Sequence, residues 1–497
     1  MKPHVPSTTA SLAGGRFVSS GHRFFLLWGL IWTLSGCGLS ANHYLLIEQS
    51  LSVNDPRRAD AVMAQAESDY GPRNRLLYNM DRGMTLHLAG NYAESNRLLE
   101  LAAQEVERLY TRSLRVETAA FLTNDMVLPY EGDPYEHVMI HVVKALNYAA
   151  MGELMEALVE ARQIDHRLNV LSDKVADKNA YREDACARYL TGLLYEAAGD
   201  LNDAFIAYRK ALEIYEANGG WARTPVPPML RADLLRVTDA LHLTAEFEEY
   251  RRRFPETRWV SRNDQPDLAQ VVVIGYNGRA PRRDETFLDL PISLSALQLV
   301  LLNRGVLHAS NRHERRVADS VLYGLNGRVV RVALPHLVPQ KTSVQYEDVT
   351  LVPREGPPVS AQSQLVYDGT ALAEQALSSR MPGITTKALA RAAMKFAAAE
   401  AATRGSQHAV SKDDAPWVGL IVGLITHGLA VASEAADTRS WRTLPDEIQI
   451  ARLWVPPGEY QSRIQTVTRG GGARPGSTRP LVLRAGQTIF VIERVIL

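Results

Sequence analysis

Two cysteines are the residues of this chain with the clearest capacity for covalent chemistry, and only the first lies in a sequence that suggests a reaction. Cys37 follows Leu34, Ser35 and Gly36. The small side chains of Ser35 and Gly36 would let the chain enter a signal peptidase in an extended form, and the Cys37 thiol is the nucleophile that would accept a diacylglycerol. Cys186 lies within a predicted helix, where we expect a buried free thiol and therefore no disulfide framework.

The segment before Cys37 has the layout of an export signal, with basic residues, no acidic residue and an apolar run at 24–32. This run is about half the length that a permanent membrane-spanning helix needs. Together with the Leu-Ser-Gly-Cys ending it resembles the signal peptide and lipobox of bacterial lipoproteins. We therefore predict removal of residues 1–36, lipid on Cys37 and a tether over 37–47; several acyl chains would anchor it stably. The alternative is an ordinary secretory signal with a chance cysteine.

A second candidate site is the acidic and aromatic segment 124–137, for which we predict contact with a protein partner. The residues predicted to make this contact are Asp125, Tyr130, Glu131, Tyr135 and Glu136. A metal site that adds His137 and His141 is one alternative, but the histidine spacings of common zinc motifs do not accompany it. The other alternative is a turn-rich connector whose Tyr130 and Tyr135 pack back onto the helices.

No catalytic constellation stands out in the sequence. There is no Gly-x-Ser-x-Gly motif, and the glycine-rich loop at 470–477 lacks the lysine of a phosphate-binding loop. Lys plus Arg and Asp plus Glu both number 55, and this balance argues against nucleic acid as the main partner. We therefore expect no enzymatic activity, no cofactor, no metal and no nucleic-acid partner.

Three copies of one spacing indicate the elements that would position these residues. Each copy has a small residue, a glycine seven residues later, and apolar, small and bulky positions at fixed offsets. The predicted packing positions are Gly83, Gly90 and Tyr92, then Ala145, Gly152 and Ala157, then Gly192, Gly199, Ala204 and Tyr208. Small residues let two helices cross closely, and the second glycine ends the first helix. The pattern resembles tetratricopeptide repeats and predicts an α-solenoid over 48–255, whose groove would hold a protein or peptide.

The character of the chain changes after residue 255. Residues 256–268 have the composition of a linker, and short runs rich in β-branched residues follow, first at 270–276 and most clearly near the end. We predict a mixed β-rich domain over 269–497 with a β-sandwich-like end over 447–497. The expected class is therefore an α+β protein of several domains.

A helix pair at 386–432 interrupts the β-rich part. Its first helix is rich in alanine, and its second, 417–432, is almost wholly apolar but only 16 residues long. Because this length is short of the roughly 20 residues that span a bilayer, we predict a buried core helix packed on the first. Insertion of the pair into a membrane is the alternative.

The segment after this pair carries two arginines around a tryptophan. We predict that Asp437 pairs with Arg439 or Arg442 while Trp441 fills a gap in the core. The alternative is a recognition surface built from the same side chains.

Several of these segments together resemble one uncharacterised family of Gram-negative lipoproteins. They are residues 124–125 with 130–136, then 145–148, 157–162 and 436–445. The resemblance implies an outer-membrane lipoprotein that faces the periplasm and carries tetratricopeptide-like repeats. It also implies a link to cell-envelope or peptidoglycan assembly, although the family has no assigned activity.

These observations lead to a ranked set of hypotheses. The first is a non-catalytic protein-binding scaffold, held at the outer membrane by lipid on Cys37, that acts in cell-envelope assembly or maintenance. The second is a homo-oligomeric, membrane-active assembly that uses the apolar hairpin 386–432, and the third is an envelope hydrolase. A body that stays soluble once Cys37 is removed would favour the scaffold, whereas a need for detergent would favour the assembly.

Overall fold

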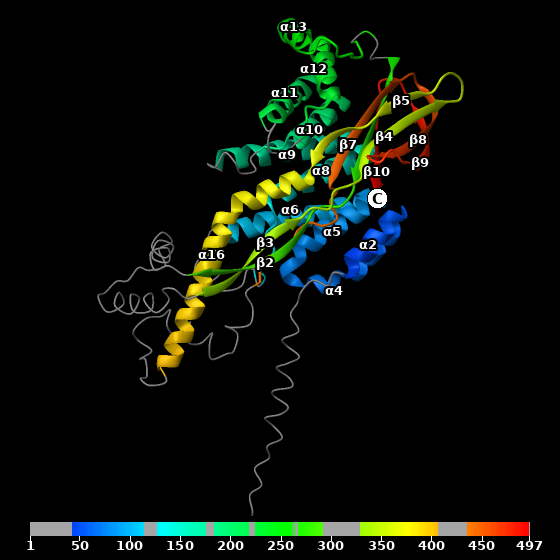
Figure 1. The fold of residues 1–497 in the computed structure, drawn as a ribbon. Coiled ribbons are helices and arrows are strands. Elements are labelled where there is room, and N and C mark those ends of the chain that lie inside the picture. Colours follow the sequence, from blue (N-terminus) through cyan, green and yellow to red (C-terminus); the bar gives the residue numbers. More distant parts are fainter. Residues whose placement is uncertain are drawn as a thin grey trace, which may run out of the picture. The chain divides into compact units, whose positions relative to one another are not determined.

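The structure is a computed structural model that describes residues 42–113, 126, 128–174, 183–217, 224–261, 263, 267–291, 329–405 and 435–496. The predicted signal peptide with Leu34, Ser35, Gly36 and Cys37 lies outside the described residues, as do Asp125 and the apolar segment 417–432. Helices fill the N-terminal half of the described chain and β-sheets the C-terminal part (Figure 1), so the predicted α+β class is confirmed.

The helical half consists mainly of successive helix hairpins. The helices are α2 (Asn42–Ser52), α3 (Pro56–Gln65), α4 (Glu67–Tyr70), α5 (Arg75–Leu88), α6 (Tyr92–Ser113), α8 (Pro134–Met151), α9 (Leu154–Lys174), α10 (Ala185–Ala197), α11 (Leu201–Ala217), α12 (Pro228–Ala240) and α13 (Thr244–Arg253), with a 3₁₀ turn η1 (Pro72–Asn74). Each of α5, α8, α10 and α12 packs against the helix that follows it. Since α2 already buries Tyr44 and Ile47, the predicted tether over 37–47 is too long and ends before Asn42.

The three repeat copies occupy the first three of these hairpins. Gly90, Gly152 and Gly199 end their helices with φ of 76°, 80° and 85°, a left-handed conformation that favours glycine. A Cβ on Gly192 would lie 2.5 Å from the ring of Tyr208, so only glycine lets α10 and α11 approach this closely. The other predicted packing positions lie at the same contacts: Gly83 faces Leu99, Tyr92 is half-buried, and Ala145, Ala157 and Ala204 are buried.

Two four-stranded sheets and a two-stranded ribbon make up the β-rich part. The strands are β1 (Ala269–Asn277), β2 (Arg282–Pro291), β3 (Val329–Val338), β4 (Val344–Pro353), β5 (Val359–Gln362), β6 (Gln364–Asp368), β7 (Glu447–Val455), β8 (Gly458–Thr468), β9 (Ala473–Leu483) and β10 (Thr488–Val495). The first sheet has the order β10-β1-β7-β6 and the second β5-β4-β8-β9, while β2 pairs with β3. Among the described strands, β1 and β10 are the only pair that is parallel.

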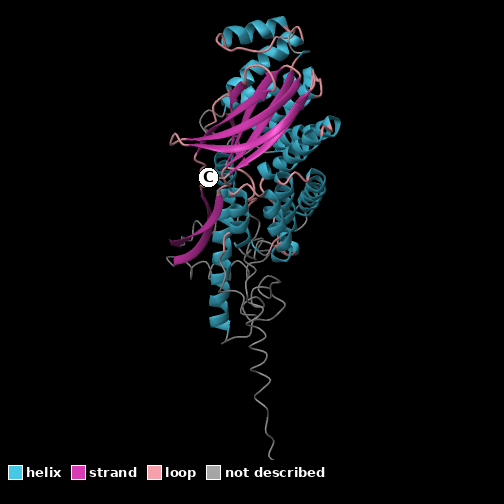
Figure 2. Cartoon of the chain, turned by 90° about the vertical axis from the view of Figure 1, so that its right-hand side faces the viewer, coloured by secondary structure: helices cyan, strands magenta, loops and turns pink. Residues whose placement is uncertain are grey.

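Figure 2 shows the strands lying beside the helices. Strand β1 is an inner strand of the first sheet, between β10 and β7. Its alternate residues Ala269, Val271 and Val273 pack with Val349 and Leu351 of β4 in the sandwich core. Its other residues face the helices, and all nine positions are buried. A strand buried on both faces reads as a continuous apolar run, as the sequence at 270–276 does.

The four strands of the predicted β-sandwich-like end over 447–497 are divided between the two four-stranded sheets. β7 and β8 are consecutive in sequence but belong to different sheets, so Pro456 and Pro457 form a corner between sheets and not a hairpin turn. β7 pairs with β1 and β6, and β8 pairs with β4 and β9. The sandwich therefore needs strands from across residues 269–495.

A long helix, α16 (Gly369–Gly405), replaces the first member of the predicted helix pair. It begins directly after β6 and packs against β3 and α8. Of the helices described, none is both long and apolar enough to cross a membrane.

The helical part and the β-rich part pack against each other. Together they form one compact unit that begins at Asn42. The residues predicted as a linker, 256–268, precede β1, but the two parts also meet across a broad buried surface. The boundary near residue 255 is therefore a change of secondary structure within one packed unit.

Candidate functional site

The face of the hairpin array that we expected to hold a partner peptide is covered by the chain's own first sheet. β10 packs on α2, α5 and α8, and β6 packs on α10. As a result α5, α8 and α10 are buried on nearly every side, in contrast to the one-sided burial of a surface helix. A partner that used this face would have to displace the sheet.

The closing segment, residues 435–446, lies in the junction between the helices and the sheets. Arg439 forms an ion pair with Asp437 at 2.7 Å and donates hydrogen bonds to Asn74 Oδ1 and Leu128 O. Trp441 is only 1% exposed, and its indole N–H donates to Thr443. The predictions of the Asp437–Arg439 pair and of a space-filling Trp441 are confirmed.

Two carboxylates at the start of α8 organise this junction. Asp133 and Glu136 form a capping box with Pro134 at the first helical position, which is the local reason that α8 begins here. Asp133 also forms ion pairs with Arg283 of β2 and Arg380 of α16. Burial alone would raise the pKa of Asp133, but these two guanidinium groups outweigh it and hold the pKa below its usual range.

Burial removes most of the predicted partner-contact residues from the surface, and this corrects the prediction. Tyr130, Tyr135 and Glu136 are at most 5% exposed. Glu136 accepts hydrogen bonds from the Tyr130 hydroxyl at 2.6 Å and from the Trp441 backbone N–H at 2.8 Å. Their partner is thus the closing segment of the same chain, which agrees with the alternative of tyrosines packed onto the helices. Glu131 is exposed.

A third buried carboxylate, that of Asp81 in α5, contacts the other end of the closing segment. Its two oxygens accept hydrogen bonds from the hydroxyls of Tyr44, Tyr70 and Thr443, at 2.6–2.9 Å. No basic side chain forms an ion pair with Asp81 among the described residues. Burial therefore raises the pKa of Asp81 to about 6.

The pKa values of two further buried acids are also raised. Burial, followed by the charge of Asp133, raises the pKa of Glu136 to about 7. Glu347 of β4 points at Gly275 between the two sheets, and neither of its carboxylate oxygens has a hydrogen-bond partner within the described part of the chain. Burial and the nearby Glu493 raise the pKa of Glu347 to about 8.

We expect these three acids to make the protein more stable as the pH falls from about 8 to about 6.5. Asp81, Glu136 and Glu347 take up protons in the folded state at a pH where the unfolded chain, with carboxyl pKa values of about 4, does not. Folding therefore binds protons in this interval, and the free energy of unfolding falls as the pH rises. Urea unfolding at several pH values measures it, and a free energy that rises steadily from pH 6.5 to 8 would contradict the assignment. Below pH 6.5 the buried His87 and His137, whose pKa values burial lowers to about 4, oppose the trend.

A cluster of two acids and two arginines joins the upper helices to the sheet. Glu196 of α10 and Asp233 of α12 both pair with Arg236 and with Arg452 of β7. All four side chains are at most 7% exposed. Burial opposes the charge of Glu196, but the arginines prevail and lower its pKa to about 2.

Sequence reasoning missed this cluster, although a signal for it was present. Arg452 interrupts the apolar run of β7, and Arg494 interrupts that of β10 in the same way. A charged residue inside a strand that is otherwise buried has to find a partner in the core. The same reasoning applies to Glu347 in β4.

The described side chains of the junction join helices to strands through hydrogen bonds and ion pairs. No group of three or more His, Cys, Asp or Glu residues that could hold a metal ion occurs in the described ranges. His137 contacts the backbone oxygen of Glu131, whereas His141 pairs with Glu160, so the two histidines of the alternative metal site have different partners. Cys186 is buried, as expected.

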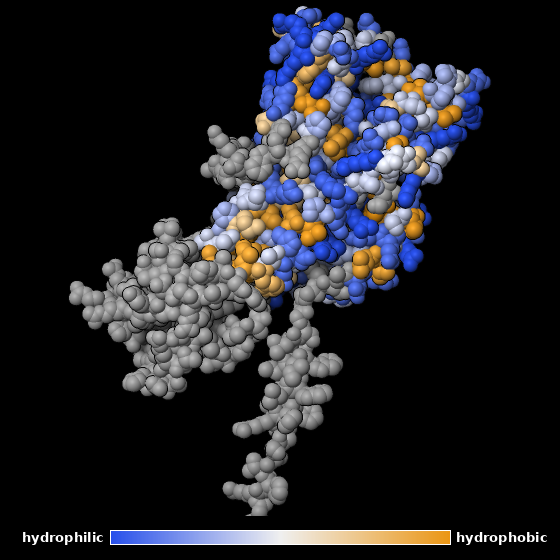
Figure 3. Space-filling view, viewed as in Figure 1, coloured by the Kyte–Doolittle hydropathy of each residue, from blue (hydrophilic) through white to orange (hydrophobic). Residues whose placement is uncertain are grey.

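The second helices of the hairpins present apolar side chains to the outside. Met155 is 66% exposed and Val159, one turn later on α9, is 51% exposed; Leu101 of α6 and Ile206 of α11 are also exposed. On the face seen in Figure 3, apolar residues form small groups among polar ones. Within the hairpins α5–α6, α8–α9 and α10–α11, the exposed large apolar side chains therefore lie on the second helices.

Comparison with known proteins adds little to this description. No protein-family model and no curated protein sequence matches the chain. Among solved structures, the crystal structure of MamA protein aligns with 44% of this chain and 96% of that one, at 11% identity and a TM-score of 0.26. A TM-score of this size does not establish a common fold.

Proposed function

We propose that the protein is a lipid-anchored, non-catalytic scaffold of the bacterial cell envelope, attached to the outer membrane and facing the periplasm. In this proposal, Cys37 carries the lipid, and tetratricopeptide-like hairpins stiffened by the β-sheets present a surface to a protein partner. The buried junction supports the proposal, since its charged groups join helices to strands and leave no open acid, base or nucleophile constellation among the described residues.

The surface of α2 supports attachment near its N-terminus. This helix begins five residues after Cys37 in the sequence, and it exposes Leu45 and Leu46. No acidic residue lies on its exposed side, which suits a helix that stays close to a lipid headgroup region.

The observation that carries the scaffold proposal is the contrast between the two faces of the hairpin array. The first helices α5, α8 and α10 are covered by strands of the same chain, whereas α9 exposes Met155 and Val159 on adjacent turns. Exposed apolar side chains at such spacing suit a helix or an extended segment of a partner protein. We therefore place partner binding on the second helices and no longer in the covered groove.

Anchoring is tested by the substitution Cys37→Ser, with Cys186→Ser as the matched control. Cells are labelled with a clickable fatty acid, and membranes are separated from soluble proteins. We expect wild type and Cys186→Ser to incorporate the label and sediment with membranes, and Cys37→Ser to lose the label and most of its membrane association. Labelling that survives in Cys37→Ser would refute lipidation at this residue.

Partner binding is tested by envelope crosslinking with the variant Met155→Glu/Val159→Glu beside the control Val482→Glu. Val482 is 64% exposed on β9, so both variants add charge at exposed apolar positions. A defined protein captured by wild type and by the control, but reduced about tenfold in the α9 variant, would support the scaffold. If the chain is instead crosslinked only to copies of itself, as a detergent-dependent series of multimers, the oligomeric, membrane-active assembly would be favoured.

A further inference from the structure

Helix α2 buries one side and exposes the other. Its buried residues are His43, Tyr44, Ile47, Ser50 and Leu51. The positions between them are exposed: Asn42, Leu45, Leu46, Gln49, Ser52 and, just after the helix, Val53. Because these positions recur at helical spacing, they form one stripe along α2 and into the turn that follows. This stripe is called the outer face of α2 below.

The outer face is apolar and carries no charged side chain. Leu45 is 55%, Leu46 46% and Val53 70% exposed. The outward side of a surface helix usually carries charged residues, and exposed apolar side chains usually occur singly. Three large aliphatic side chains in one uncharged stripe are therefore the pattern of a contact surface.

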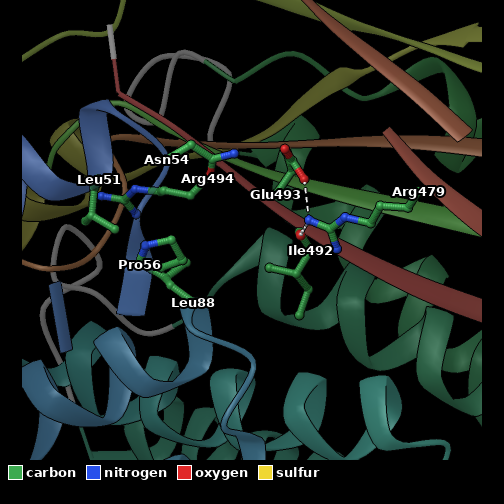
Figure 4. A pocket seen from close by; sticks show the side chains of 8 residues that line it. All are labelled: Leu51, Asn54, Pro56, Leu88, Arg479, Ile492, Glu493 and Arg494. Atoms are coloured by element: carbon green, nitrogen blue, oxygen red, sulfur yellow. Dashed lines mark hydrogen bonds and ion pairs between the residues drawn. The ribbon is translucent and has the colours of Figure 1, made fainter. Parts of the chain in front are cut away.

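The inner side of α2 holds the helix on the body of the protein. Near its start, the Tyr44 hydroxyl donates a hydrogen bond to Asp81 of α5 at 2.6 Å. Near its end, Leu51 lines a small cavity together with Leu88 of α5 and Ile492 of β10 (Figure 4). Since both ends are fixed in this way, α2 presents its outer face away from the core in one orientation.

The charges around the outer face suit an anionic surface. Glu48 is the only acidic residue of α2, and it pairs with two arginines of the β-rich part, at 3.3 and 3.6 Å. In the turn that follows, Asp55 caps α3 and accepts a hydrogen bond from the backbone N–H of Arg58. The side chains of Arg57 and Arg58 are exposed and form no ion pair within the described chain. The turn therefore has a net positive charge next to the apolar stripe.

The place of α2 in the sequence indicates which partner its outer face meets. Cys37, the proposed lipid anchor, precedes Asn42 by five residues. Five residues span at most about 18 Å even when fully extended. A lipid on Cys37 would therefore keep the start of α2 within about 18 Å of the bilayer surface, and α2 itself, with 11 residues, is only about 16 Å long.

We propose that the outer face of α2 docks on the lipid bilayer. The helix lies along the surface, with Leu45, Leu46 and Val53 at the boundary between anionic head groups and acyl chains. This second contact fixes the orientation of the body relative to the membrane, which a lipid tether alone does not. The inference rests on the proposed function for the place of the anchor, and it adds that the folded chain itself binds the membrane.

The test couples one myristoyl chain to Cys37 through a maleimide, in the chain 37–497, which contains the whole compact unit that begins at Asn42. Cys186 is buried and does not compete for the reagent. A single acyl chain binds vesicles only marginally and reversibly, with a constant of about 10⁴ M⁻¹, so a second contact changes the bound fraction measurably. Flotation with vesicles of phosphatidylethanolamine and phosphatidylglycerol gives the partition constant.

The variant Leu45→Gln/Leu46→Gln removes two apolar side chains from the outer face. Phe287→Gln/Leu288→Gln is the matched control, because these neighbours on β2 are 50% and 40% exposed. We expect a partition constant about tenfold lower for the α2 variant and unchanged for the control. Gln49→Leu extends the apolar stripe at an exposed position and should raise the partition constant about threefold, so the test does not depend on a loss alone.

Equal partition of wild type and Leu45→Gln/Leu46→Gln would overturn the proposal, as would an equal loss in the control variant. If the α2 variant keeps its partition but loses a crosslinked protein in envelopes, the outer face binds a protein and not lipid. Because the acyl chain is attached chemically, the result does not depend on whether cells lipidate Cys37. Failure of lipidation in cells and failure of docking by α2 are therefore separate outcomes.

Discussion

Replacing Arg452 by methionine is expected to lower the free energy of unfolding by about 3–5 kcal/mol. The change leaves two buried carboxylates, Glu196 and Asp233, with Arg236 as their only cation. A methionine fills much of the lost volume, so the effect reports chiefly the uncompensated charge. Urea unfolding followed by circular dichroism and by tryptophan fluorescence measures it.

Two further variants make the Arg452 experiment decisive. Arg209→Met removes an exposed arginine 3.9 Å from Glu213 and should change the free energy by no more than about 0.5 kcal/mol. The double variant Arg452→Met/Asp233→Asn restores the balance of one acid to one base and should recover part of the loss. A loss below about 1 kcal/mol for Arg452→Met would mean that the cluster does not join helices to sheet.

Replacing Trp441 by alanine is expected to cost about 3–5 kcal/mol, as truncation of a large buried aromatic does. Trp441 is the largest of the fully buried side chains, and its own backbone N–H donates to Glu136. The cavity left behind would loosen the closing segment from α5 and α8. We therefore also expect faster proteolytic cleavage within residues 435–446.

Two comparisons control the Trp441 experiment. Trp441→Phe keeps most of the volume and loses only the indole hydrogen bond to Thr443, so we expect a cost of about 1–2 kcal/mol. Trp259→Ala removes a half-buried tryptophan after α13 and should cost less than Trp441→Ala. Equal costs for the two alanine variants, without new cleavage in the closing segment, would argue against its role as a clamp between the two parts.

The local elements of this protein could be predicted from the sequence because their determinants are local. Gly90, Gly152 and Gly199 mark the turns of three hairpins, since a left-handed conformation at a helix end favours glycine whatever surrounds it. The run of β-branched residues at 270–276 indicated a strand, which is β1. The pairing of Asp437 with Arg439 was also accessible, because the two residues are close in sequence.

The candidate site depended on contacts between residues far apart in the chain, and local patterns do not encode these. Tyr130 and Glu136 looked like surface residues of an acidic loop, but Arg439 and Trp441 of the closing segment, some 300 positions later, contact them. β7 and β8 are consecutive in the sequence, yet each pairs with strands from residues 269–368. Local sequence patterns were enough to predict the helix hairpins and the strands, and the composition gave the balance of charges. Only the tertiary structure decided that a sheet fills the array's expected groove and that Arg452 and Arg494 lie inside, because burial depends on which distant segments meet.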